Sequence, residues 1–223
     1  MYSKSIMNQR AMLKGEDALD LLHRISTVDL KRLKPGQKTL ALILNPQGKI
    51  RVIFNIMVLN SKEVEVEFDV PFLEILSEFT FGEQYEMIPL SPPIEAEPKE
   101  RERILGLVPK LGVEFKCNGE TNPLEVNLRS AIHDQKGCYP GQEVVEKIIS
   151  LGSPAKKLCL FEGVLENIDC PAKLFNESGL EAGTLTSYRD GIALGILKRP
   201  FLHENEIFLV QSQKITLRKI SNL

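Results

Sequence analysis

The sequence predicts an α+β protein that ends in a small all-β unit, either a barrel or a sandwich. Two patterns carry this prediction. Residues 1–90 contain an amphipathic helix, two β-rich segments and a second amphipathic helix in that order, which is typical of an α+β sandwich. After residue 153 only short β segments follow. The chain has 223 residues, 43% of them hydrophobic, which allows one large or two small units with a sizeable core.

The N-terminal part, residues 1–90, is built from local periodicities. The spacing of apolar residues predicts a helix at 15–25, with Ala18, Leu21, Leu22 and Ile25 on one stripe. Strands are predicted at 50–59 and 63–70, joined by a short turn. Pro71 opens a second helix whose apolar stripe contains Phe72, Ile75, Leu76 and Phe79.

The strand at 63–70 alternates strictly between apolar and acidic side chains. Val64, Val66, Phe68 and Val70 share one face, and three glutamates and Asp69 share the other. Because side chains of a strand alternate between its two faces, we expect the apolar set in the core and the acidic set in solvent.

The middle and C-terminal parts show a change of composition. Residues 91–103 are rich in proline and charge without periodicity, which predicts a linker or exposed loop, and the charge run at 95–103 is expected to be solvated. Asn122-Pro123-Leu124-Glu125 has the residues of a capping box and predicts a helix that carries Leu124, Leu128 and Ala131. Beyond it, β segments are expected at 158–165, 183–187, 192–197, 207–210 and 215–220.

Composition excludes several classes of function. The 28 Lys and Arg residues nearly balance 30 Asp and Glu residues, so nucleic acid is not expected as the main partner. No apolar run is long enough to span a membrane, and the N-terminus lacks a secretory signal, so a cytoplasmic location is expected. The four cysteines form no C-x-x-C pair and the three histidines are scattered; we predict reduced thiols and assign no metal.

The segment Lys136–Glu143 is the strongest candidate for a functional site. The apolar spacing that follows it predicts a helix that starts close to Gly141, and Pro140-Gly141 suits the centre of a type II turn. The thiol of Cys138 would then lie just before a helix N-terminus and near Lys136, which favours its thiolate form. The alternative is that Cys138 is a small buried residue in a tight turn.

This segment reads K-G-C-Y-P-G-Q-E and resembles the K-G-C-Y-x-G-Q-E signature of the YgfZ family of folate-binding proteins, relatives of the glycine-cleavage T-protein. Leu13–Leu59 looks like the family's N-terminal stretch, and Asn122–Glu125 is similar to its N-P-x-E segment. The resemblance implies a T-protein-like folate-binding α+β region, here shortened, followed by a C-terminal β-barrel. We therefore expect the folate-binding region at 1–90 and 104–153 and the barrel at 154–223.

The resemblance also implies a function and a set of site residues. It implies a tetrahydrofolate-binding accessory protein for the assembly or repair of iron–sulfur enzymes, with Cys138 as the functional thiol and Lys136 beside it. A buried carboxylate suits the donor-rich edge of a pterin, so Glu125 is the expected folate ligand, although it could equally cap its own helix. Further folate-binding candidates, each with a purely structural alternative, are Asp69, Tyr139, Gln142 and Glu143.

Three departures from the family pattern leave alternatives open. T-proteins carry a catalytic Asp shortly after the turn at 45–48, where this chain has Val52 and Ile53. Lys147 stands where the family usually has Arg after G-Q-E, and the chain is short between Tyr85 and Arg103. The alternatives are therefore a folate-dependent aminomethyl transferase of the T-protein type, which the missing carboxylate disfavours, and a non-catalytic scaffold that has lost its folate.

Overall fold

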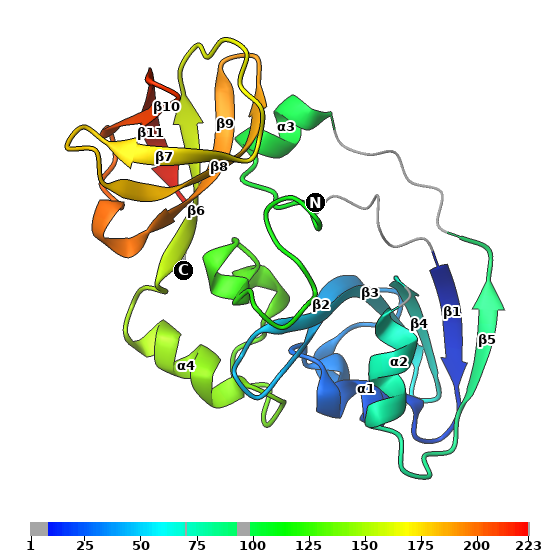
Figure 1. Ribbon diagram of the computed structural model, residues 1–223. Coiled ribbons are helices and arrows are strands. Elements are labelled where there is room, and N and C mark those ends of the chain that lie inside the picture. The colour runs from blue at the N-terminus through cyan, green and yellow to red at the C-terminus, as the bar shows by residue number, and fades with distance from the viewer. Residues whose placement is uncertain (1–8, 70, 93–98, 223) are drawn as a thin grey trace.

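A computed structural model describes residues 9–69, 71–92 and 99–222. It consists of a five-stranded antiparallel sheet with two helices, a middle segment of short helices, and a six-stranded closed β-barrel (Figure 1). The α+β class and the C-terminal barrel expected from the sequence are confirmed, and the choice between barrel and sandwich is settled in favour of the barrel. Among the described residues, no helix combines the length and the apolar character needed to cross a bilayer.

The sheet has the strand order β2-β3-β4-β1-β5, with β5 at the outer edge and β2 toward the rest of the molecule (Figure 1). Its strands are β1 (Gln9–Lys14), β2 (Lys38–Leu44), β3 (Ile50–Asn60), β4 (Glu63–Phe68) and β5 (Glu86–Leu90). The two predicted helices are present as α1 (Ala18–Ile25) and α2 (Pro71–Glu78). Their apolar stripes bury one face of the sheet, as the core around Phe54, Phe68 and Phe72 shows.

The acidic face of β4 is not exposed as the alternation suggested. Glu65 and Glu67 are 8% and 5% exposed. Glu65 accepts two hydrogen bonds from the Arg10 guanidinium at 2.6 and 2.8 Å, and Glu67 accepts from Lys38 at 2.5 Å and from the Asn55 amide at 3.0 Å. A buried carboxylate is tolerated when such partners replace water. The prediction of a solvated face is therefore wrong for these two residues, because their partners on β1, β2 and β3 are invisible to a local pattern.

The middle segment differs most from expectation. A helix, α3 (Glu100–Leu105), begins within the range 91–103 that was predicted to be a linker, so its charged residues 100–103 are helical; residues 93–98 lie outside the described part of the chain. The helix expected from Asn122 onward is instead two 3-10 turns, η2 (Pro123–Glu125) and η3 (Arg129–Ala131). Between them Asn127 has a left-handed φ of 60°, and its amide donates to the Leu107 carbonyl at 2.8 Å, which ends the helical path. The segment ends in α4 (Gln142–Ser150).

The barrel has the order β10-β11-β6-β9-β8-β7 and closes through pairing of β10 with β7. Its strands are β6 (Lys156–Glu162), β7 (Ala172–Asn176), β8 (Glu181–Arg189), β9 (Ile192–Lys198), β10 (Ile207–Val210) and β11 (Gln213–Ile220), with a 3-10 turn, η4 (Arg199–Phe201), after β9. The sequence predicted all of these strands except β7. Inside, Phe161 and Phe208 pack edge to face with centroids 6.0 Å apart.

Candidate functional site

The predicted turn of the K-G-C-Y-P-G-Q-E loop is present. The Gln142 N–H donates to the Tyr139 carbonyl at 3.2 Å, and Gly141 has φ 79° and ψ 4°, the values of the third residue of a type II turn. Gly141 is also the N-cap of α4, so Cys138 lies three residues before the helix, as expected. Local turn chemistry therefore fixes the backbone on which the candidate side chains stand.

The three segments that carry the family resemblance pack against one another. A Cβ on Gly141 would lie 2.4 Å from the Asn45 carbonyl oxygen and 2.8 Å from the Gly48 Cα. Both distances are too short for a carbon atom, so only glycine fits here. The Asn122 amide donates to the Gly48 carbonyl at 3.0 Å. The turn at 45–48, the start of η2 and the start of α4 thus form one packed junction.

Lys136 is buried without a partner. Its side chain has no hydrogen bond to any described residue although its ammonium nitrogen is inaccessible to solvent, and the residue is 7% exposed. The ammonium lies over the Tyr139 ring, 5.4 Å from the centroid, which stabilises a cation only modestly. Burial lowers the pKa of Lys136 to about 8, while Asp29 and Cys138 oppose this shift. This amine is therefore close to its titration point near neutral pH.

Sequence reasoning missed three residues whose charges act on this lysine, namely Asp29, His23 and His133. Asp29 Oδ1 lies 3.7 Å from His23 Nδ1, and the Asp29 N–H donates to His133 Nδ1 at 3.2 Å. Burial lowers the pKa of both histidines. The only available signal was Asp29 itself, which lies within Leu13–Leu59, the stretch that resembles the N-terminal part of the family. Within the described residues, no group of His, Cys, Asp and Glu side chains has the arrangement of a metal site.

The four cysteines differ in exposure. All four are free; Cys138 and Cys170 are exposed, Cys117 is partly buried and Cys159 is buried. Burial raises the pKa of Cys117 and Cys159 to about 12 and raises that of Cys170. Since the thiolate is the reactive form, Cys117 and Cys159 are poor nucleophiles at neutral pH. The alternative of Cys138 as a small buried residue does not describe its position.

Glu125 both caps its turn and retains a free oxygen. Its Oε2 accepts from the Asn122 N–H at 3.3 Å, which completes the predicted capping box, and lies 3.9 Å from Lys49 Nζ. Both contacts use the same oxygen, so Oε1 has no hydrogen-bond partner among the described residues. The structural role and a ligand role are therefore compatible in geometry.

The other loop candidates lie at the start of α4. Tyr139 is half-buried and packs against the core between sheet and middle segment, and burial raises the pKa of its hydroxyl to about 12. The Gln142 amide donates to Glu146 at 2.5 Å, and Glu143 is exposed in the first turn of the helix. These positions give Tyr139 a role in packing, Gln142 a hydrogen bond within α4, and Glu143 a place in the first turn of the helix, where a negative charge is favoured.

Asp69 stands in another place, beside the positions where T-proteins carry their catalytic carboxylate. It lines a cavity of about 20 Å³ together with Arg51, Val52, Ile53 and Cys117. None of the residues 136–143 lines this cavity. It has room for about one water molecule.

Comparison with known proteins defines the fold. A scan against known protein families gives no match. A chloroplast protein of Arabidopsis thaliana named "Putative transferase" is 30% identical over 92 residues, which are 39% of this chain and only 21%, about a fifth, of the relative. The crystal structure of glycine cleavage system aminomethyltransferase T from Bartonella henselae matches with a TM-score of 0.78 at 14% identity, over 96% of this chain and 83% of that one. The chain therefore has the fold of the glycine-cleavage T-protein.

Proposed function

We propose that this protein binds a reduced folate in its α+β region and supports the assembly or repair of iron–sulfur enzymes through Cys138. The observation that carries the proposal is an exposed thiol two residues from a buried, unpartnered lysine, on a chain with the fold of an aminomethyltransferase. An unpaired buried ammonium costs stability, and such costs are typical of functional sites. The iron–sulfur role follows the resemblance of residues 136–143 to the YgfZ signature.

Glu125 is the residue best suited to hold the pterin ring. A pterin presents adjacent N–H donors on one edge, and a carboxylate with a free oxygen can accept from them. Oε1 of Glu125 has no partner among the residues described, and the carboxylate is anchored through Oε2 by the backbone of its own turn. An anchored carboxylate loses little conformational entropy on binding.

Cys138 and Lys136 would supply the chemistry of the site. The exposed sulfur of Cys138 can ligate iron, and Lys136, when protonated, interacts favourably with negative charge on that sulfur. With a pKa of about 8, Lys136 can also release its proton near neutral pH. Both groups belong to one loop, residues 136–143.

Titration with tetrahydrofolate tests the folate part of the proposal. Calorimetry and thermal unfolding of the full chain should show binding and a raised melting temperature, because a ligand that binds only the folded state stabilises it. Glu125→Gln should weaken binding about tenfold, whereas Glu120→Gln, at an exposed neighbour, should not. If millimolar tetrahydrofolate gives neither heat nor a thermal shift, the folate proposal fails and the non-catalytic scaffold takes its place.

Complementation tests the iron–sulfur part. In cells that lack the protein, wild type should restore the activity of iron–sulfur enzymes and Cys138→Ser should not. Cys170→Ser is the matched control because Cys170 is also an exposed cysteine, on the barrel side of the chain. Full restoration by Cys138→Ser would contradict the role of this thiol without affecting the folate result.

Aminomethyl transfer is the second candidate, and the small cavity argues against it. Val52 and Ile53 are buried and apolar, so neither can hold a proton for the reacting nitrogen. Asp69 is a carboxylate that lines the same cavity as Val52 and Ile53, and this cavity is too small for a substrate. We expect no release of ammonia and methylene-tetrahydrofolate from an aminomethylated lipoyl carrier above the rate without protein. A rate above that background would favour the transferase.

A further inference from the structure

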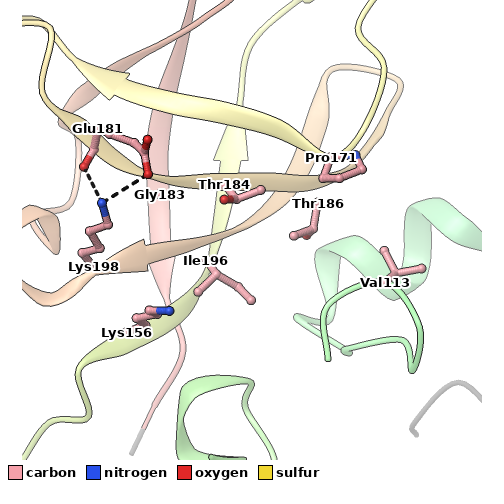
Figure 2. A pocket seen from close by; sticks show the side chains of 9 residues that line it. All are labelled: Val113, Lys156, Pro171, Glu181, Gly183, Thr184, Thr186, Ile196 and Lys198. Carbon is pink, nitrogen blue, oxygen red and sulfur yellow. Dashed lines mark hydrogen bonds and ion pairs between the residues drawn. The ribbon is translucent and has the colours of Figure 1, made fainter. Parts of the chain in front are cut away.

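A second hollow lies where the barrel meets the middle segment, away from the loop 136–143. It has a volume of about 330 Å³, and Figure 2 shows the side chains around it. Strands β6, β8 and β9 form its floor, and Val113, from the loop after α3, stands opposite them. Small-molecule sites are concave, often lie between structural units, and begin at about this volume.

One end of this hollow carries a net positive charge. Lys156 and Lys198 are directly opposite each other in the antiparallel pair of β6 and β9. Like charges in such a pair destabilise a sheet unless something between them compensates. Lys198 donates to the carbonyl and carboxylate of Glu181 at 3.0 and 3.3 Å (Figure 2), but Lys156 has no hydrogen bond or ion pair with any described residue.

The single glutamate of the hollow does not balance its lysines. Glu181 also accepts from Lys173 at 2.7 Å, and its two lysine partners lower its pKa, so it stays ionised at neutral pH. The lining of the hollow itself holds Lys156, Lys198 and Glu181, which leaves a net charge of +1, and Lys173 pairs with Glu181 from outside the lining. Lys156 is thus a cation that is free to meet an external anion.

The opposite side of the hollow is apolar. Val113 lines this side and is 45% exposed, so its side chain is available for an apolar contact. Ile196 lies on the floor between Lys156 and Thr184, and the Thr184 hydroxyl has no hydrogen-bond partner among the residues described (Figure 2). A suitable ligand therefore has an oxyanion at one end and an apolar body at the other.

We propose that this hollow binds a small organic anion, a phosphate or carboxylate carried on a compact apolar group. Lys156 and Lys198 bind the oxyanion, Thr184 donates a hydrogen bond, and Ile196 and Val113 contact the apolar body. This site is independent of the folate proposal, because it shares no residue with the loop 136–143 or with Glu125. It would make the barrel a second ligand-binding unit of the chain.

The test is a titration of the full-length protein followed by amide chemical shifts, with phenyl phosphate and benzoate as probes. Benzyl alcohol is the control that lacks the charge, and inorganic phosphate is the control that lacks the apolar body. We expect the amides of Thr184 and Ile196 to shift with at least one organic anion, which also identifies the preferred oxyanion. We expect weaker binding of both controls. Affinity should fall as salt is added, because exposed lysines are screened.

A matched pair of variants locates the binding. Lys156→Gln should weaken the preferred probe about threefold to fivefold, the upper part of the range for one exposed ion pair. Lys219→Gln removes the same charge from an exposed position on β11 and should leave the affinity unchanged. The proposal is overturned if neither organic anion binds at millimolar concentration, if a control binds as tightly, or if the two variants behave alike.

Discussion

Two buried cations in this protein have opposite environments. Arg103 of α3 is 2% exposed and uses all five of its N–H donors, which bond to Glu100 twice and to Glu114, Ser187 and the Val108 carbonyl once each, at 2.6 to 3.0 Å. Lys136 is almost as buried and has no partner among the described residues. Burial alone therefore does not define the role of a charged residue; the completeness of its hydrogen bonds does.

The difference separates a structural cation from a reactive one. The fully paired Arg103 joins α3 to the barrel strand β8, because Glu114 also accepts from Thr186 and Ser187 at 2.9 and 2.6 Å. A guanidinium does not lose its proton in a protein, so the role of Arg103 is structural. The unpaired amine of Lys136 has a lowered pKa and sits beside an exposed thiol. The same contrast should appear in the free energy of unfolding when either residue is replaced.

The largest expected effect is the loss of Arg103. Arg103→Met leaves the carboxylate of Glu114, which is fully buried, without its counter-ion, and should lower the free energy of unfolding by about 4 kcal/mol. Glu100→Gln removes only a partly exposed partner and should cost less than about 1 kcal/mol. Denaturant unfolding of both variants measures this. Equal costs for the two substitutions would mean that the network does not join the barrel to the middle segment.

The next effect concerns how the loop is held. If Lys136 does not stabilise its own loop, packing must, and Gly141 is the point of closest packing. Gly141→Ala should cost about 3 kcal/mol, because it adds a clash with the Asn45 carbonyl to the strain of a left-handed residue. Gly137→Ala has the same type of strain, with φ 95°, but open space around it, and should cost about 1 kcal/mol. If both substitutions lowered the free energy of unfolding by similar amounts, packing at Gly141 would not be what holds the loop in place.

These examples also show what a sequence can predict. The helices at 15–25 and 71–79 and the turn at 139–142 followed from local spacing and Pro-Gly chemistry, and all three are present. The helix α3 was missed because four of its six residues are charged, so no apolar period marks it, and because Arg103 is paired in part with Ser187 of the distant strand β8. Only tertiary structure shows that a polar residue belongs to a core.

The candidate site divides in the same way. Its loop, residues 136–143, is contiguous, so its turn and its place before α4 could be predicted from the sequence. Asp29 and His133 come from distant parts of the chain, and their contact depends on the packing of the sheet against the middle segment. For the same reason the sequence could not show whether Glu125 only caps its turn or also keeps one carboxylate oxygen free.

The third effect has the opposite sign. Lys136→Met should raise the free energy of unfolding by about 2 kcal/mol at pH 7, because it replaces an unpaired buried ammonium with an apolar side chain. The pKa of Lys136 is about 8 in the folded protein against an ordinary 10.5, so the unfolded chain binds more protons between these values. Wild-type stability should therefore rise relative to the variant across that pH window, and the difference should close near its upper end.

The measurement is denaturant unfolding of both proteins from pH 7 to pH 10.5, with Lys219→Met as the control. The control replaces an exposed lysine and should show no such pH-dependent difference. A destabilising Lys136→Met would show that this ammonium has a partner in solution. The contrast with Arg103 would then be lost.

The smallest expected effect on stability is that of Cys138→Ser. Because the thiol is exposed, its replacement should change the free energy of unfolding by less than about 0.5 kcal/mol. Cys159→Ser, inside the barrel core, should cost about 2 kcal/mol because it buries a hydroxyl in apolar surroundings. In the native protein at neutral pH, iodoacetamide should alkylate Cys138 first and Cys117 and Cys159 far more slowly, since burial raises the pKa of both to about 12. A Cys138 that is alkylated no faster than these two, or a Cys138→Ser variant as unstable as Cys159→Ser, would make the thiol part of the packing rather than of the chemistry.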